Sequence, residues 1–254
     1  MPTTNEPDAG NEPLTLAIDI GGSHLKAGVL DPAGAMIVGP ERVKTPKPAK
    51  PAAVVAALID LANRLNRFDR ISVGFPGVVR TGLVLTAPNL GTRDWRCFPL
   101  AAELARHVGK PTRMLNDASI QGLGVISGRG LECVLTMGTG MGFALFEDGR
   151  IAPHLEMSQH PARKGKTYDQ YVGNAALQDI GAKHWNRRMC KVIDTMKVLV
   201  TYDALYIGGG NARVIKPPLP DNVKLVSNEA GITGGVRLWD PRMELTFAPH
   251  GAFE

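Results

Sequence analysis

The residue types best suited to chemistry in this chain are acids that stand beside glycine turns. Asp19 ends a short apolar run and is followed by Gly21, Gly22 and Ser23, with Lys26 three residues further on. Glycine lets backbone N–H groups approach a phosphate closely, and an acid at the end of a strand can hold a Mg²⁺-bound water. A tight hairpin with an acid at its edge gives the same pattern. The turn therefore indicates either a phosphate-binding loop or an ordinary hairpin.

Two further glycine turns follow apolar runs. Their small residues are Gly138, Thr139, Gly140 and Gly142 in the first turn and Gly208, Gly209 and Gly210 in the second. The first turn has no Gly-Lys-Ser/Thr ending and opens no predicted helix, so it fits neither the Walker nor the dinucleotide-binding template. The second precedes a predicted helix, whose free N-terminal N–H groups suit an anion or a nucleotide phosphate. Close packing of that helix against its strand is the alternative.

A polar pair, Asn116 and Asp117, stands where a predicted strand passes into a helix. Strand ends that face a cleft are where catalytic side chains are expected. There Asp117 could act as a general base that accepts a hydroxyl proton while Asn116 orients the substrate. An acid at the start of a helix is also a common N-cap, so a structural role is the alternative.

A segment with both acid and imidazole groups runs from His154 to His160 and includes Glu156. These side chains could bind a metal, but no further ligand follows at a spacing typical of metal sites. Sugar binding or loop packing is therefore the favoured interpretation.

Basic residues gather just downstream, at Arg163, Lys164 and Lys166, with Arg187 and Arg188 further along. Such a cluster is typical either of a solvated surface or of a track for a polyphosphate chain. Aromatic residues are not interleaved with these cations as they are in proteins that bind single-stranded nucleic acid. We therefore expect no nucleic-acid partner.

Composition limits the class of protein. The chain has 254 residues, 44% of them hydrophobic and 21% charged, with a formal net charge of +5. This length predicts one or two domains with cores of their own, and the apolar content excludes wholesale disorder. Nowhere do about 18 apolar residues run together, so we expect no membrane span and no membrane partner.

The N-terminus and the cysteines indicate the cellular compartment. Residues 1–13 are polar and acidic without an apolar segment, so we expect a disordered tail and no secretion signal. The cysteines, Cys97, Cys133 and Cys190, stand isolated in the sequence. A disulfide framework or a structural zinc cluster is therefore not expected, and a reducing cytoplasm is the predicted location.

The candidate residues need elements that bring them together. Apolar periodicity predicts strands over 14–20, 24–30, 35–38, 70–75 and 112–115, a hairpin over 78–86, and helices over 52–66 and 100–108. The order recurs with strands over 133–137, 143–146, 204–207 and 224–226 and helices over 168–181, 183–200 and 229–238. The economical fold is α/β, with two stacked units, residues 14–115 and 116–254, each holding a mixed sheet, and a cleft between them. We expect the last helix, near 229–240, to pack back on the first unit.

Taken in order, these motifs resemble those of the ROK family (repressors, open reading frames and sugar kinases) of the actin-like ATPase superfamily. The matching stretches are Asp19–Lys26, Phe75–Val78, Asn89–Gly91, Asn116–Ala118, Gly138–Gly142, His154–Glu156 and Gly208–Gly210. The tract Arg163–Gly173 is similar to the polyphosphate/ATP glucokinase branch. The likeness covers about residues 14–240 and implies two actin-like (RNase H-like) domains.

The resemblance implies a sugar kinase that transfers a phosphoryl group from polyphosphate, ATP or both to O6 of glucose or a related hexose, with Asp117 as the base. The sugar-binding residues that it implies are Gly77, Asn89, Asn116, Glu156, Gln159 and His160. The phosphate- and nucleotide-binding residues that it implies are Asp19, Gly21, Gly22, Ser23, Lys26, Gly138, Thr139, Gly140, Gly142, Gly208, Gly209 and Gly210. It also implies Mg²⁺ held by Asp19 through water, a polyphosphate track at Arg163, Lys164 and Lys166, and a homodimer.

The chain departs from the family's pattern at two places. Most ROK kinases carry a cysteine-rich zinc motif that is absent here, as in the polyphosphate branch, so no zinc is expected. Glu156-Met157-Ser158-Gln159 stands where the family has Glu-x-Gly-His. Gln159 thus replaces a sugar-contacting histidine, and it can form hydrogen bonds but carries no charge, while His160 could substitute. The alternatives are a kinase for mannose or an amino sugar, and a catalytically weak sugar sensor or regulator.

Overall fold

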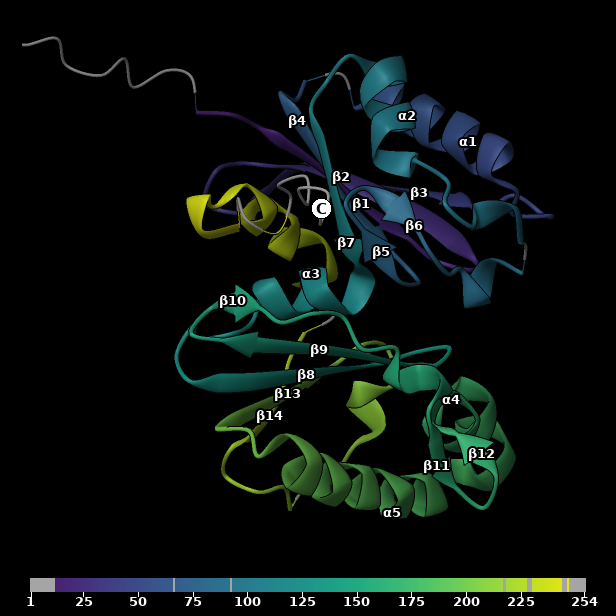
Figure 1. Ribbon diagram of the computed structural model, residues 1–254, viewed down its shortest axis with the longest axis vertical. Helices are drawn as coiled ribbons and strands as arrows, with labels where there is room; N and C mark the ends of the chain where they lie inside the picture. The colour runs from purple at the N-terminus through teal and green to yellow at the C-terminus, as the bar shows by residue number, and fades with distance from the viewer. Residues whose placement is uncertain are drawn as a thin grey trace, which may run out of the picture.

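The structure is a computed structural model that describes residues 12–243 and 246, except residues 66, 92, 217, 228 and 229. Most of the predicted N-terminal tail, residues 1–11, lies outside these described residues. Two five-stranded sheets lie one above the other in Figure 1, with helix α3 (Asp117–Leu123) between them. Among the helices described, none is both long and apolar enough to cross a membrane.

The first sheet has the strand order β3-β2-β1-β4-β7. In that order the strands span Met36–Lys44, His24–Leu30, Thr15–Ile20, Arg70–Phe75 and Thr112–Asn116. The strands β1, β2 and β3 form an antiparallel meander, whereas β4 and β7 continue the sheet parallel to β1. Because the carboxyl ends of parallel strands meet at one edge of a sheet, the residues after β1, β4 and β7 come together there.

Two helices cover one face of this sheet. In α1 (Pro51–Arg64) the buried residues Val54, Val55, Leu58 and Leu61 recur at helical spacing and pack on the sheet. The second helix, α2 (Leu100–Val108), ends at Gly109, which adopts a φ of +71° and whose N–H bonds the carbonyl of Ala105 at 2.9 Å. A glycine takes that left-handed conformation without strain, which explains the sharp end of the helix.

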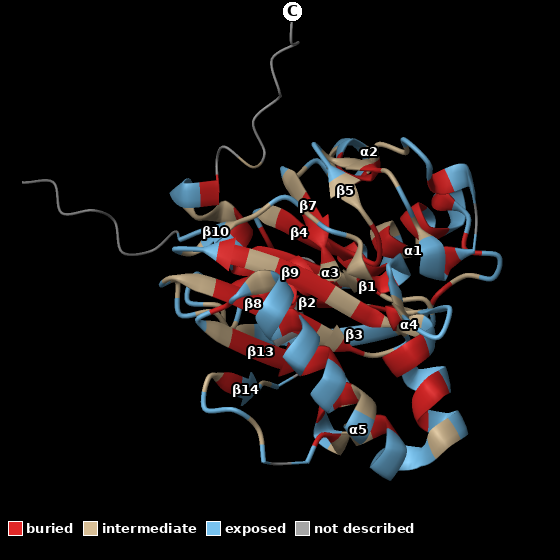
Figure 2. Cartoon of the chain, turned by 60° about the horizontal axis from the view of Figure 1, so that its bottom comes forward, coloured by how far each residue is buried: buried red, intermediate tan, exposed pale blue. Residues whose placement is uncertain are grey.

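The second sheet repeats the first. Its order is β10-β9-β8-β13-β14, with strands at Arg150–Ile151, Met141–Glu147, Leu131–Met137, Ala204–Gly208 and Val223–Leu225. Again three strands are antiparallel and two continue in parallel. Helices α4 (Tyr168–Val172) and α5 (Asn174–Val200) pack on its outer side, and Figure 2 shows the exposed outer face of α5. The backbone leaves the helical conformation at Gly181, where the sequence predicts a break between two helices.

The short helix α3 fills the space between the two sheets. Ala118, Ile120 and Leu123 belong to a buried apolar cluster that also contains Phe146 of the second sheet. At Gly122 the approach is so close that an added Cβ would lie 2.4 Å from the Phe146 ring. Glycine is required at this position because no larger residue leaves room for the sheet.

The C-terminal segment returns to the first sheet. It contains α6 (Ala230–Thr233) followed by 3₁₀ turns at Gly234–Trp239 and Pro241–Met243, in place of the single helix predicted over 229–238. Ile232 and Val236 pack on Ala17 of β1. The buried Ser72 hydroxyl donates to the Gly235 carbonyl at 2.7 Å and accepts a bond from Trp239 Nε1 at 2.9 Å. The consecutive glycines at 234 and 235 disfavour a continuous α-helix, which explains the difference from the prediction.

Two other elements differ from the prediction. β3 reaches Lys44 rather than ending near Val38, because it is an edge strand, where Pro40 needs no hydrogen-bond partner, and its pairing with β2 shifts register. In the described residues 211–216, no α-helix follows Gly208–Gly210 directly. A single 3₁₀ turn, Ala212–Val214, comes there instead, ahead of the prolines Pro218 and Pro220.

Two short strand pairs complete the fold. The first joins β5 (Val79–Arg80) to β6 (Leu83–Val84), and the second joins β11 (Pro161–Arg163) to β12 (Lys166–Thr167). The first pair follows the loop after β4, and the second carries the predicted basic cluster.

Candidate active site

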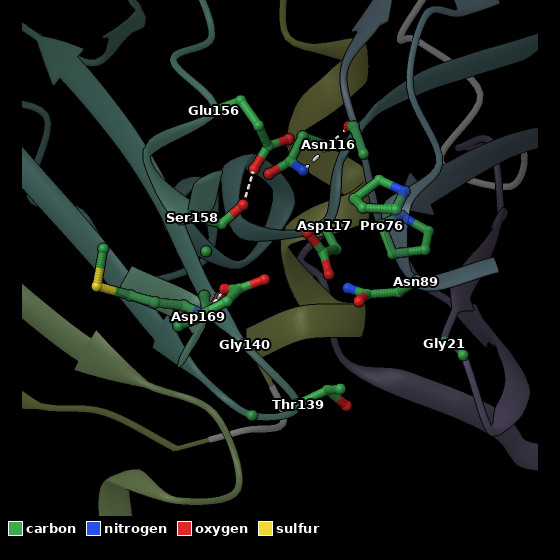
Figure 3. Close-up of a pocket in the computed structure, with 17 residues that line it drawn as sticks. Gly21, Pro76, Asn89, Asn116, Asp117, Thr139, Gly140, Glu156, Ser158 and Asp169 are labelled. Atoms are coloured by element: carbon green, nitrogen blue, oxygen red, sulfur yellow. Dashed lines mark hydrogen bonds between the residues drawn. The ribbon is translucent and has the colours of Figure 1, made fainter. Parts of the chain in front are cut away.

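One cavity lies between the two halves, and half of the predicted site residues line it, Asp117 among them. It contains about 640 Å³ of space that no atom fills, part of it open to solvent. Its lining residues are Gly21, Gly22, Pro76, Gly77, Pro88, Asn89, Asn116, Asp117, Thr136, Gly138, Thr139, Gly140, Met141, Gly142, Glu156, Ser158 and Asp169. Figure 3 shows Asp117 with Asn89 and Pro76 on one side and Ser158 and Asp169 on the other. Both sheets therefore contribute to one site.

Asn116 fixes the geometry at the centre of the cavity. Its side-chain oxygen caps α3 by accepting the N–H groups of Ala118 at 2.9 Å and Ser119 at 3.4 Å. Its amide nitrogen donates to the carbonyls of Phe75 at 3.4 Å and Gly77 at 3.1 Å. A buried amide that meets four backbone groups is held in one orientation. Asn116 thus positions both the start of α3 and the loop after β4.

Asp117 lies at the first position of α3 and lines the cavity. Burial raises the pKa of this carboxyl group to about 7, and the negative charges of Asp19 and Glu156 add to the increase. The backbone N–H of Ala118, 2.8 Å from Asp117 Oδ1, acts in the opposite direction. An acid with a pKa near neutrality is well matched to accept a proton from a substrate hydroxyl.

The turn after β1 and the loop after β4 both pack at the cavity wall against the segment that carries Thr86 and Asn89. A Cβ on Gly22 would lie 3.0 Å from the Asn89 carbonyl, and a Cβ on Gly77 would lie 2.1 Å from the Thr86 carbonyl. Gly77 therefore allows the loop to close against the segment that carries Asn89. No residue with a side chain fits there without moving the loop.

The glycine loop between β8 and β9 is held by Asp169 of α4. Oδ1 of Asp169 accepts the backbone N–H of Met141 at 2.7 Å, and a Cβ on Gly140 would lie 2.1 Å from the same oxygen. Burial raises the pKa of Asp169, while the bond from Met141 lowers it. The carboxylate thus occupies the space that the missing side chain of Gly140 leaves.

Glu156 enters the cavity with two supporting side chains. The Ser158 hydroxyl donates to Oε1 of Glu156, and Nε2 of His154 lies 3.6 Å from Oε2, an ion-pair distance rather than a hydrogen bond. Burial alone would raise the pKa of Glu156, but His154 and Ser158 outweigh it, so the pKa lies below its ordinary value. Glu156 is therefore held ionised in a fixed orientation.

Several predicted residues lie outside the lining of this cavity. These are Asp19, Ser23, Lys26, Gln159, His160, Gly208, Gly209, Gly210, Arg163, Lys164 and Lys166. Asp19 still acts on the site through its charge, and Lys26 Nζ lies 3.3 Å from its Oδ2. His160 is exposed, with its ring 6.3 Å from that of Tyr168. Gln159 reaches the site indirectly, by donating to Asp169 Oδ2 at 3.2 Å.

The turn at 208–210 supports the glycine loop rather than lining the cavity. A Cβ on Gly209 would lie 2.4 Å from the Met137 carbonyl, so this turn packs directly under the end of β8. The next residue, Asn211, donates to the Gly138 carbonyl at 3.1 Å. Of the two interpretations of this sequence, close packing describes the observed contacts. The expected helix N-terminus is wrong because the turn is followed only by a 3₁₀ turn.

Sequence reasoning did not single out Ser158 or Asp169 as lining residues. Asp169 lies in the tract that resembles the polyphosphate branch, and its place in the first turn of α4 after the Thr167 cap was a usable signal. Pro76, Pro88 and Thr136 line the cavity beside predicted residues. Local patterns could not indicate these because their positions depend on how the two halves pack.

The acids near the cavity fit a Mg²⁺ ion that is shared with a phosphate substrate. Burial raises the pKa of Asp19 despite its ion pair with Lys26, and the charge of Asp19 in turn raises the pKa of Asp117. A divalent cation would relieve that repulsion. Among the described residues, no group of three His, Cys, Asp or Glu side chains is placed to hold a metal ion. Magnesium in kinases needs only one or two carboxylates, since phosphate and water complete its shell.

Comparison with known proteins gives the class. The sequence model of the ROK family matches residues 15–153. The polyphosphate glucokinase of Mycobacterium tuberculosis is 31% identical over 256 aligned positions, which cover 91% of this chain and 93% of that protein. A glucokinase of Streptomyces coelicolor is 33% identical over 137 positions, covering 51% of this chain and 42% of that protein.

Solved structures agree on the architecture. The inorganic polyphosphate/ATP-glucomannokinase of Arthrobacter sp. strain KM superposes with a TM-score of 0.81 at 26% identity, covering 89% of this chain and 98% of that one. A ROK glucokinase of Streptomyces griseus, solved with glucose and AMPPNP, gives a TM-score of 0.71 at 20% identity and shares the fold. Fold and relatives together define a phosphotransferase of the actin-like, two-domain class. Within that class, this chain belongs to the ROK family, which confirms the predicted family and fold.

Proposed function

We propose that the chain is a sugar kinase that phosphorylates O6 of glucose or a related hexose. The observation that carries this proposal is Asp117, an acid of pKa about 7 that lines a cavity between the two halves. In the proposed reaction, Asp117 accepts the proton of the sugar hydroxyl as its oxygen attacks the terminal phosphorus of the donor. The bond from that phosphorus to the bridging oxygen breaks, and the shortened donor leaves with the electron pair.

The acceptor side of the cavity carries groups suited to sugar hydroxyls. Glu156 is held ionised and accepts hydrogen bonds, while Asn89 offers both donor and acceptor atoms beside the Gly77 loop. The side-chain amide of Asn116 forms its hydrogen bonds with backbone groups, so we assign it a positioning role beside the sugar. Gln159 and His160 lie outside the lining, and we assign neither a direct sugar contact.

The donor side is formed by two glycine turns. Gly21 and Gly22 line the cavity from the first half, and the Gly138–Gly142 loop lines it from the second. Backbone N–H groups of such turns suit phosphate oxygens, and Mg²⁺ would neutralise charge on the transferred group when bound. Asp19 would hold that ion through water. Closure of the two halves would exclude water and suppress hydrolysis of the donor.

The donor is proposed to be polyphosphate, ATP or both. Two curated relatives support this: one is called a polyphosphate glucokinase and the other a glucokinase. The exposed hairpin residues Arg163, Lys164 and Lys166 are proposed as the polyphosphate track. A homodimer in the cytoplasm remains a prediction that the family resemblance and the isolated cysteines support.

A coupled assay over several hexoses, with ATP and polyphosphate supplied separately, tests this function. We expect turnover with glucose or a close relative and its collapse in Asp117→Ala. Mannose and amino sugars are included because Gln159 replaces the family's histidine. If sugar binds but neither donor yields sugar phosphate, the chain is instead a sugar sensor.

A further inference from the structure

A chain of hydrogen bonds joins the two sides of the cavity. The Ser158 hydroxyl donates to Oε1 of Glu156. The amide nitrogen of Gln159 donates to Ser158 Oγ at 3.1 Å and to Asp169 Oδ2 at 3.2 Å. The other carboxylate oxygen of Asp169 accepts the backbone N–H of Met141 at 2.7 Å. The bonds therefore run without interruption from the acceptor side of the cavity to the glycine loop.

The hydrogen-bond chain uses both protons of the Gln159 amide nitrogen. Ser158 has one proton, which goes to Glu156, so its oxygen can only accept from Gln159. Both carboxylate oxygens of Asp169 act as acceptors, Oδ1 from Met141 and Oδ2 from Gln159. A single nitrogen that donates to two acceptors is found in the NH₂ group of a glutamine, whereas a neutral imidazole has one N–H and a carboxylate has none.

At the end nearest the glycine loop, the hydrogen-bond chain is held firmly by Asp169. Asp169 lies in the first turn of α4, which begins with a capping box between Thr167 and Gln170. A Cβ on Gly140 would lie 2.1 Å from Oδ1 of Asp169, so the loop cannot move far unless this carboxylate moves with it. A displacement of Glu156 and Ser158 would therefore reach the loop through these bonds.

We propose that Gln159 is a positioning residue that couples sugar binding at Glu156 to phosphate binding at the Gly138–Gly142 loop. This inference rests on the proposed function, which assigns the sugar and the phosphate to those two places. Coupling between two ligands is reciprocal, so each ligand tightens the binding of the other by one factor. Because Gln159 is exposed, each of its bonds contributes modestly, and its loss should reduce that factor about three- to tenfold.

The experiment measures the dissociation constant of glucose with and without saturating AMPPNP and Mg²⁺, and that of AMPPNP with and without glucose. Tripolyphosphate serves as a second donor probe. The proteins are the wild type, Gln159→Ala, Gln159→Glu, Ser158→Ala and the control Gln178→Ala, an exposed glutamine on α5. Gln159→Glu keeps the size of the side chain but loses both donors, so it tests the proposal even if Gln159→Ala folds poorly.

The expected result is a coupling factor above one in the wild type and in Gln178→Ala, and a factor about three- to tenfold smaller in Gln159→Glu. The affinity for glucose alone should change little, which a general structural defect would not produce. A wild type that binds both ligands with no coupling overturns the inference, as does equal coupling in Gln159→Glu. A wild type that binds neither ligand and forms no sugar phosphate contradicts the proposed function instead.

Discussion

The negative charge of Asp19 raises the pKa of Asp117. Burial is the larger cause and the charge of Asp19 the next, so that Asp117 reaches a pKa of about 7 at the start of α3. Asp19 lies near the end of β1 and Asp117 follows β7, two strands of one sheet that are separated only by β4. The site thus holds two carboxyl groups that resist being ionised together, which suits one of them to take up a proton.

The pH dependence of turnover should report this relationship. The base must be ionised, so we expect kcat/KM to rise about tenfold per pH unit below pH 7 and to level off above it. In Asp19→Asn the repulsion is removed, the pKa of Asp117 falls, and the acid limb should move to lower pH even though the rate drops. Steady-state kinetics from pH 5 to 9 measure the acid limb in the wild type and in Asp19→Asn. A limb at the same pH in both proteins contradicts the assignment.

Asp117→Asn should stabilise the protein while removing activity. The carboxyl group has a pKa near 3.9 when unfolded and about 7 when folded, so the folded state binds the proton more tightly. Its contribution to stability is therefore present below about pH 4 and is lost as pH rises through 7. The variant should exceed the wild type in Tm by several degrees at pH 8, about 2–4 °C per kcal/mol, and by much less at pH 5. Equal differences at the two pH values would refute this.

Gly77→Ala should impair the acceptor side of the cavity. Its Cβ would lie 2.1 Å from the Thr86 carbonyl, which forces the loop away from Asn89 and breaks the bond from Asn116 to the Gly77 carbonyl. A misplacement of this size should lower kcat/KM for sugar by about tenfold to a hundredfold. The donor KM should change far less. Thr81→Ala, an exposed change in the following hairpin, is the control and should behave like the wild type.

The basic hairpin should distinguish the two donors. Replacing Arg163, Lys164 and Lys166 together by Ala should lower kcat/KM for polyphosphate about tenfold, which is about 1.4 kcal/mol shared among three exposed charges. The loss should shrink at high salt. ATP use should fall less than about twofold on the same grounds. The matched control replaces Arg64, Arg67 and Arg106, exposed cations of the first half. Equal losses with both donors would exclude a polyphosphate track here.

Ser72→Ala should lower the stability of the protein. The change leaves the Gly235 carbonyl and Trp239 Nε1 without their buried partner. We expect a loss of about 2–4 kcal/mol in the free energy of unfolding, measured by urea titration. Ser23→Ala, at an exposed serine, should cost little stability. A stable Ser72→Ala protein would mean that these bonds contribute nothing to the attachment of the C-terminal segment.

The parts that the sequence predicted are those with a local physical cause. Asn116 ends the buried strand β7 and Asp117 begins the helix after it, and the carboxyl ends of such strands are where catalytic residues are expected. The repeated strand order could be predicted because apolar alternation and glycine turns set it. For Asp169 the sequence offers only its place in the first turn of a helix, because its bond to Met141, 28 residues away, depends on how α4 packs against the glycine loop.

The errors also have physical causes. The turn at 208–210 resembles a helix start only when the prolines beyond it are ignored, since they leave room for one 3₁₀ turn. The direct sugar contact that the family resemblance implies for Gln159 stays a prediction. The bonds from its amide to Ser158 and Asp169 are not encoded in any local sequence pattern.

The return of the chain from β14 to the first sheet limits how the protein can move. The polypeptide passes from one half to the other at Asn116 and again before α6, and both α6 and the turn after it pack beside α3. Because both covalent links lie on the same side of the protein, they permit one half to rotate about a single axis and oppose sliding or twisting of one half against the other. We therefore expect substrate to enter when one half rotates about α3. The two glycine turns proposed to bind the phosphoryl donor should then move farther than Asp117, which lies at the start of α3 and so on the axis.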